Sequence, residues 1–181
     1  MLRREGIGAT TFDAIAQQAG LARSTLYRNW ASRDDLLLEA IEEQAPFPAT
    51  LPGAPTPARL EAALQEIGAA LGTTSWGWIL PAALAATDAS PFLSEHYHRF
   101  TTTLRGVFTT IVDDGKKTGE LPPDLDGDDF TDALIGPLFF RRLIRKRPAD
   151  PTWIRNHLQR TLAAFGAGPN TAAKTHAPLT A

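Results

Sequence analysis

The chain has 181 residues, 43% of them hydrophobic, and its formal net charge is −2 at pH 7. This length and composition can bury a core, so we do not expect a chain that is disordered overall. The absence of cysteine excludes disulfides and thiolate metal sites and fits a reducing compartment. No apolar segment is long enough to span a bilayer as a helix and no signal peptide is visible, which predicts a cytoplasmic protein without a membrane partner.

The first predicted elements are two short helices joined by a turn, between Thr10 and Trp30. Thr10 or Thr11 can cap the first helix, and Gly20 suits the turn because that position needs a positive φ. The apolar stripe of the first helix consists of Phe12, Ile15, Ala16 and Ala19. In the second helix we expect Leu21 and Leu26 to be the anchors. This arrangement predicts a helix-turn-helix.

Further helices follow the motif. Ser32 and Asp35 form a capping box that begins a helix at 33–44, and five prolines between 46 and 57 predict a loop at 45–55. Caps, prolines and apolar spacing then predict helices at 56–72, 76–86, 91–117, 128–147 and 151–165. The predicted fold class is all-α, with an N-terminal helix-turn-helix domain at 1–45, a larger C-terminal helical domain at 56–166, and a disordered tail at 167–181.

The second helix of the motif carries chemistry suited to DNA. A protruding helix fits the major groove of B-DNA, where short donors approach base edges and arginine reaches guanine or phosphate. Residues 1–33 hold five arginines against Glu5 and Asp13, a net side-chain charge of +3. The same pattern also occurs in all-α proteins that never bind DNA. The candidate DNA-binding residues are Thr10, Thr11, Ala22, Arg23, Ser24, Thr25, Tyr27, Arg28, Asn29 and Arg33.

The stretch TTFDAIAQQAGLARSTLYRNW, extended through Ser32 to Leu37, closely resembles the DNA-binding domain of the tetracycline-repressor (TetR) family of bacterial transcription regulators. In that family a run like residues 21–30 forms the recognition helix. Asn29 and Trp30 stand where the family usually has His and Phe. Most of the helix that precedes the motif in the family is missing here, so we expect either a start upstream of Met1 or a reduced core.

The resemblance also implies a small-molecule sensor that works as a homodimer. Effector and double-stranded DNA would compete through the helix at 33–44, and two recognition helices would read a pseudo-palindromic operator. Spacing alone favours core packing for the aromatic residues of the middle helices. The candidate effector residues are Trp76, Trp78, His96, Tyr97, Phe100, Leu104 and Phe108. The candidate dimer residues, on the last two helices, are Leu134, Leu138, Phe139, Arg142, Ile154, Leu158 and Leu162.

Other chemistry finds little support in the sequence. Glu95 and His98 have the i, i+3 spacing of di-iron bundles, but the second pair and the two further glutamates are not visible, so we predict no metal and no cofactor. No catalytic motif is present, which predicts a protein that is not an enzyme. Five basic residues within 139–147 suggest a partner-facing helix or a second nucleic-acid patch. Two alternatives stay open, namely a helical sensor or adaptor that has lost DNA binding, and an α-helical enzyme that uses His96 and His98.

Overall fold

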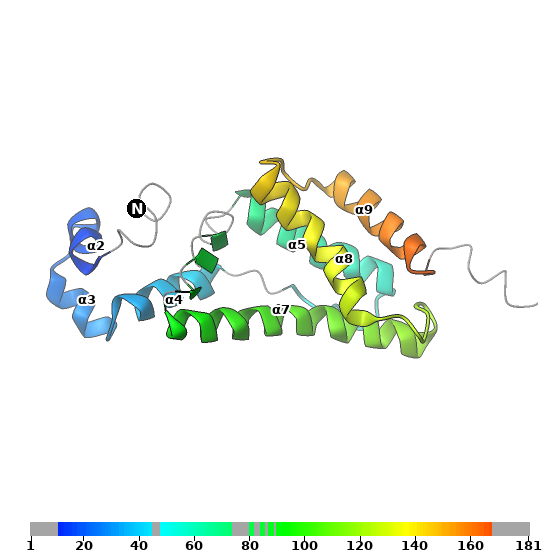
Figure 1. The fold of residues 1–181 in the computed structure, drawn as a ribbon, viewed down its shortest axis with the longest axis horizontal. Helices are drawn as coiled ribbons and strands as arrows, with labels where there is room; N and C mark the ends of the chain where they lie inside the picture. Colours follow the sequence, from blue (N-terminus) through cyan, green and yellow to red (C-terminus); the bar gives the residue numbers. More distant parts are fainter. Residues whose placement is uncertain are drawn as a thin grey trace, which may run out of the picture. The chain divides into compact units, whose positions relative to one another are not determined.

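The computed structural model describes residues 11–44, 48–73, 80–81, 84–85, 87–88 and 90–167, and α-helices dominate this part of the chain (Figure 1). The all-α prediction is therefore confirmed. The chain forms two compact units, one of residues 1–46 and 70–103 and the other of residues 47–69 and 104–181. Two long helices, α5 (Thr56–Thr73) and α7 (Pro91–Thr118), contribute residues to both units.

The predicted helix-turn-helix is present as α2 (Phe12–Ala19) and α3 (Arg23–Asn29). Thr11 caps α2 by accepting a hydrogen bond from the backbone N–H of Ala14, and Gly20 ends it with a φ of 67°. The core of the motif is small. It consists of buried Phe12, Ala16 and Leu26, with Ile15, Trp30 and Leu36 packed against them.

The prediction that Leu21 anchors the second helix is wrong. Its side chain is 48% exposed, because α3 begins only at Arg23 and Leu21 still belongs to the turn. Its backbone N–H donates to the carbonyl of Ala16, which fixes the turn without use of the side chain. Leu26 is thus the one buried residue of α3.

Helix α4 (Arg33–Gln44) begins at the predicted capping box. The Ser32 hydroxyl accepts from the backbone N–H of Asp35 and donates to the Asp35 carboxylate. At the start of α7, Ser90 likewise accepts from the backbone N–H of Leu93. Both helices therefore begin where sequence caps predicted them to begin.

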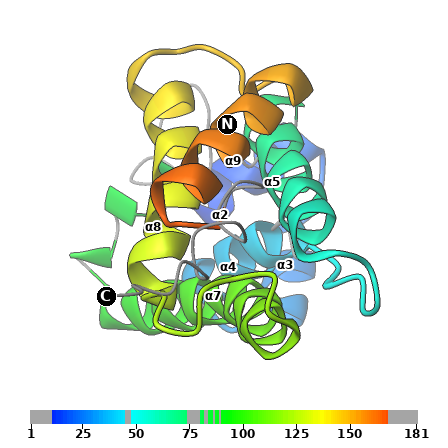
Figure 2. The same cartoon turned by 90° about the vertical axis from the view of Figure 1, so that its right-hand side faces the viewer.

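The second unit contains α8 (Gly127–Phe139) and α9 (Pro151–Ala164) as well as parts of α5 and α7. Figures 1 and 2 show α9 lying along both α5 and α8. Gly68 permits the approach of α9 to α5, since a Cβ at that position would lie 2.8 Å from Cδ1 of Ile154. His157 of α9 bonds to the carbonyl of Leu134 on α8 at 3.0 Å. The large buried side chains of this unit include Leu60, Leu64, Ile67, Phe108, Ile111, Phe130, Leu134 and Leu138.

The predicted continuous helix at 128–147 is wrong in its second half. A π-helix, η1 (Phe140–Ile144), follows α8, and the N–H of Arg145 donates to the carbonyl of Phe140 five residues earlier. Pro137 disturbs only the turn before it, because proline supplies no N–H and its ring crowds the carbonyl four residues earlier. The helical segment ends where Lys146 adopts a positive φ of 53°.

Several expectations fall on residues outside the described ranges. They are most of the predicted helix at 76–86, nearly all of the tail at 167–181, and Thr10 with the residues before it. Within the described ranges, no helix is both long and apolar enough to cross a membrane.

Candidate nucleic-acid interface

Helix α3 presents a row of exposed polar side chains on a fixed support. The side chain of Leu26 is buried on the inner face of the helix. Four other side chains of α3 are exposed, those of Arg23, Ser24, Tyr27 and Arg28. The ring of Tyr27 meets the ring of buried Phe12 edge to face, with centroids 4.8 Å apart and an interplanar angle of 89°. Tyr27 is nevertheless 59% exposed. Its ring is thus held at one edge while most of the side chain faces solvent.

The three arginines of the motif differ in their surroundings. Arg23 forms an ion pair through its Nε with the carboxylate of Asp13 on α2. Arg33 is half-buried and donates from Nε and Nη2 to one oxygen of its neighbour Asp34, at 3.1 and 2.9 Å. Arg28 is exposed and has no ion-pair partner within the described residues. Arg28 is therefore the arginine most available to a phosphate, whereas Arg33 is already engaged.

The remaining candidate residues of this surface are Thr11, Ala22, Thr25 and Asn29. Thr11 and Ala22 are exposed and occupy the N-cap positions of α2 and α3. Thr25 is half-buried, and the side-chain amide of Asn29 donates to its carbonyl at 3.0 Å. The structure therefore places most of the described candidates on α3 and its N-cap, while Thr11 lies at the start of α2 and Arg33 at the start of α4. Thr10 lies outside the described residues.

Sequence reasoning missed two acidic residues that hold this surface in place. One is Asp13, the partner of Arg23. The other is Glu39 of α4, whose carboxylate accepts a hydrogen bond from the indole Nε1 of Trp30 at 2.9 Å. A phenylalanine at position 30 has no such donor, so the tryptophan adds a polar tie between the end of α3 and α4. Neither partner is adjacent in sequence to the residue it holds, which is why spacing gave no signal.

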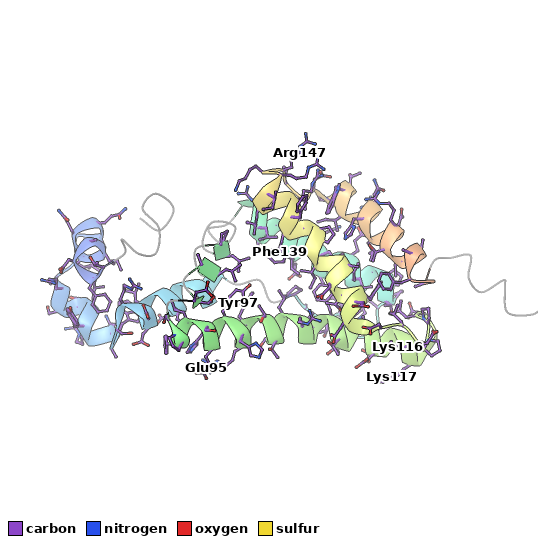
Figure 3. The ribbon with its side chains drawn as sticks, viewed as in Figure 1. Glu95, Tyr97, Lys116, Lys117, Phe139 and Arg147 are labelled. Carbon is purple, nitrogen blue, oxygen red and sulfur yellow. The ribbon has the colours of Figure 1, made fainter. Side chains whose placement is uncertain are left out.

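The candidate effector residues fall into several groups. Trp76 and Trp78 lie outside the described residues, His96, Tyr97 and Phe100 are half-buried, and Leu104 and Phe108 are buried in core positions. Tyr97 and Glu95 point to opposite sides of α7 (Figure 3), and burial raises the pKa of the Tyr97 hydroxyl. The structure does not by itself gather these residues into a described cavity.

A cavity of about 420 Å³ lies elsewhere, within the second unit, and residues of α5 and α7 line it. Its charged groups are paired. Buried Arg59 donates to the carbonyl of Thr50 and to the carboxylate of Asp114, and the Glu120 carboxylate accepts from the first N–H of α5, that of Thr56. These contacts stabilise the fold around the cavity.

The candidate dimer residues divide into two sets. Leu134, Leu138, Ile154, Leu158 and Leu162 are buried within the subunit, so their side chains pack on its own core and do not face a partner. Phe139 and Arg142 are partly exposed. Their neighbours Phe140 and Ile144, which the sequence reasoning did not select, are 56% and 68% exposed. Phe139 ends α8 and Arg147 lies beyond η1 (Figure 3). Residues 139–144 thus expose apolar surface at the end of α8 and in η1.

The residues considered for metal binding or catalysis are Glu95, His96 and His98, in the first half of α7. Glu95 and His98 are exposed, and Nδ1 of His96 lies 2.9 Å from the carbonyl of Phe92 in the preceding turn. Over the described part of the chain, no group of three or more His, Asp or Glu side chains is placed to hold a metal ion.

Comparison with known proteins agrees with this geometry. The chain is 25% identical over 167 residues to YdeS, a helix-turn-helix type transcriptional regulator of Bacillus subtilis, covering 86% of this chain and 79% of the relative. It is 29% identical over 154 residues to a helix-turn-helix type transcriptional regulator of Mycobacterium tuberculosis, covering 82% of this chain and 73% of the relative.

Solved structures show the same fold. The crystal structure of the TetR family transcription regulator SCO0332 superimposes with a TM-score of 0.64 at 26% identity, over 90% of both chains. That of a TetR-family regulator from Rhodococcus sp. gives a TM-score of 0.72 at 20% identity, over 91% of this chain and 92% of the other.

Two family models also match. The model of bacterial regulatory proteins of the tetR family matches residues 1–40, and the model described as the tetracyclin repressor-like, C-terminal domain matches residues 56–161, more than half of the chain. With its helix-turn-helix and its helical C-terminal part, this chain belongs to the TetR family of DNA-binding transcription regulators.

Proposed function

We propose that this regulator is a homodimeric repressor that binds a pseudo-palindromic operator and leaves it when a small molecule binds. The observation that carries the proposal is the exposed row of donors on α3, supported by a core to which the helix contributes only Leu26. A helix so anchored can enter the major groove with its polar side chains toward base edges and phosphates. Two such helices in a dimer read two half-sites.

Salt dependence of binding tests the DNA contact. We expect log affinity for duplex DNA from the region upstream of the gene to fall linearly with log salt, because phosphate contacts release counterions. Fluorescence anisotropy of a labelled duplex at several salt concentrations measures this slope. A regulator that binds with no salt slope would contradict the proposal.

Arg28→Ala tests the phosphate contact assigned to the unpaired arginine. Each lost phosphate contact reduces the slope by about 0.9, so a dimer that loses two should lose roughly 1.8. Arg160→Ala is the matched control, because it removes the same charge from an exposed position on α9, far along the chain from α3. An equal loss of slope in both variants would mean that Arg28 acts only through net charge.

The route from effector to DNA is proposed to run through α4. In the first unit the Ser90 hydroxyl, at the start of α7, donates to Asp34 in the first turn of α4 at 3.2 Å. Asp34 in turn holds Arg33. A shift of the first turn of α7 can therefore act on α4 through this side-chain contact. Effector and DNA affinities are then coupled reciprocally, so that operator DNA weakens effector binding by the same factor.

The dimer surface is proposed to include Phe139, Phe140, Arg142 and Ile144, the exposed or half-exposed residues at the end of α8 and in η1. The alternative function is a helical sensor or adaptor without DNA binding. Gel-shift assays separate the two functions, since the alternative gives no shift with any upstream duplex while thermal-shift screening still finds ligands.

A further inference from the structure

We propose that Asp13 of α2 is a positioning residue that sets operator specificity, because its carboxylate holds Arg23 so that the end of the guanidinium faces a guanine edge. The inference rests on the proposed contact between α3 and the major groove. It assigns a role to an acidic residue on a surface that must approach DNA, where a negative charge alone would weaken binding.

The geometry of the ion pair leaves the useful end of Arg23 open. Asp13 engages Nε, and no other hydrogen bond or ion pair to Arg23 is present within the described residues. The terminal nitrogens Nη1 and Nη2 are therefore available as a fork of parallel donors. Such a fork matches O6 and N7 of guanine in the major groove, the commonest specific arginine contact.

Both partners stand on fixed supports. Asp13 follows the Thr11 cap and buried Phe12 in the first turn of α2. Arg23 is the first residue of α3 and lies one helical turn before buried Leu26. The carboxylate thus limits the rotamers of a long side chain whose backbone is already held. An arginine that contacts a base loses side-chain conformational entropy. Because the ion pair already restricts Arg23, less entropy is lost when it binds DNA.

A purely structural role explains the pair less well. An acidic residue in the first turn of a helix is favourable to the helix dipole, but that effect does not require Arg23 as a partner. Both side chains are also well exposed, 60% for Arg23 and 56% for Asp13. Exposed ion pairs contribute little to folding stability. Loss of the Asp13 carboxylate should therefore alter DNA recognition far more than folding.

The test compares specific and non-specific binding of the full chain. The specific probe is a duplex that the wild-type protein selects from a randomised library, and the non-specific probe is a shuffled duplex of the same composition. For Asp13→Asn we expect tighter binding to the shuffled duplex, because a negative charge is lost, and weaker binding to the selected one. The specificity ratio should fall roughly tenfold, within the range that one bidentate base contact provides.

Matched variants separate positioning from charge. Asp13→Glu keeps the carboxylate and should retain the ratio within about threefold, since a longer side chain still reaches an exposed arginine. In an Arg23→Ala background, Asp13→Asn should leave the ratio unchanged. The Tm of Asp13→Asn should stay within about 2 °C of the wild type. Selections repeated with Asp13→Asn should lose the guanine preference at one position in each half-site.

The inference is overturned if Asp13→Asn raises both affinities by the same factor, because Asp13 then only repels phosphate. It is also overturned if the variant lowers the ratio equally with and without Arg23. If the wild-type protein selects no sequence at all, the proposed DNA recognition fails and the inference fails with it. A wild type that selects a sequence whose preference Asp13→Asn preserves defeats the inference alone.

Discussion

His157 shows how one buried side chain can make the stability of the second unit depend on pH. It lies in α9, stacked on Trp153 with ring centroids 5.0 Å apart, and its Nε2 faces the carbonyl of Leu134. Because a carbonyl only accepts, Nε2 carries the hydrogen. Burial lowers the pKa of His157, and nearby Arg160 acts in the same direction, while the Leu134 carbonyl opposes the shift. The guanidinium of Arg141 lies over the other partner of the stack, Trp153.

We predict that stability falls as pH is lowered through about 6.5, the usual histidine value in an unfolded chain. The folded pKa is the lower of the two, so the unfolded chain takes up a proton first and unfolding becomes easier; the loss levels off below the folded pKa. Urea unfolding between pH 7.5 and 5.5 measures this slope. His157→Gln, which keeps a donor for Leu134, should flatten it, and His98→Gln on an exposed site should not.

Tyr27 offers a second test at the scale of a single atom. Tyr27→Phe keeps the ring on Phe12 and removes only the hydroxyl, so folding should be unchanged. The loss of one hydrogen bond to phosphate in each subunit should weaken operator binding by roughly tenfold. Anisotropy titration and a thermal melt on the same sample check both expectations. An unchanged affinity would remove Tyr27 from the contact set.

At the scale of elements, the sequence predicts helix caps but not contacts between residues that are distant along the chain. Thr11, Ser32, Ser90 and Asp150 each cap the helix that follows, and such caps can be predicted because they join residues only two or three positions apart. The carboxylate that accepts from the first N–H of α5 is different. It belongs to Glu120, 64 residues away, and no local sequence pattern predicts this contact. The same holds for the Asp13 to Arg23 pair at the candidate site.

Two other predictions, the continuous helix at 128–147 and the anchoring role of Leu21, are wrong for reasons that lie close by in the sequence. Pro137 could signal a helix break or a kink, and the choice of a π-helix at 140–144 depends on how the next residues pack. Leu21 fits an amphipathic pattern yet lies in the turn. Helical spacing predicts which residues can share a face, but the start of the helix decides whether they do.

Ser90 has two roles that substitutions can separate: it caps α7, and it donates a hydrogen bond to Asp34 of α4. Ser90→Asp keeps a good N-cap but places a second carboxylate against Asp34. We expect faster amide exchange in the first turn of α4 and little change in the first turn of α7. Ser90→Ala should speed exchange in both. Hydrogen exchange followed by mass spectrometry resolves the two segments. If the two variants change exchange equally in both segments, the hydrogen bond from Ser90 to Asp34 does not couple α7 to α4.

At the scale of the whole molecule, the fold is retained at low identity. Relatives and solved structures at 20–29% identity match most of the chain, and the two solved structures superimpose on it over about 90% of its length. The proposed operator and dimer surfaces consist of exposed or half-exposed residues of α3, α8 and η1.

The dimer surface is open to a direct test. Ile144→Asp places a charge on the most exposed of the large apolar residues within the described chain, so the fold should tolerate it. We expect the dimer dissociation constant to rise roughly tenfold or more, since a buried charge without a partner is costly at an interface. Sedimentation equilibrium measures the constant. Leu84→Asp, at another exposed leucine, is the control and should leave the dimer intact.

The way α3 is anchored has a consequence for how such a regulator changes over evolutionary time. Of its seven residues only Leu26 is buried, and substitutions at exposed positions away from special contacts usually cost little stability. A gene duplicate can therefore exchange much of this helix and acquire a new target sequence without an intermediate that fails to fold. The fold constrains which helix contacts DNA, while the DNA sequence that this helix recognises can change.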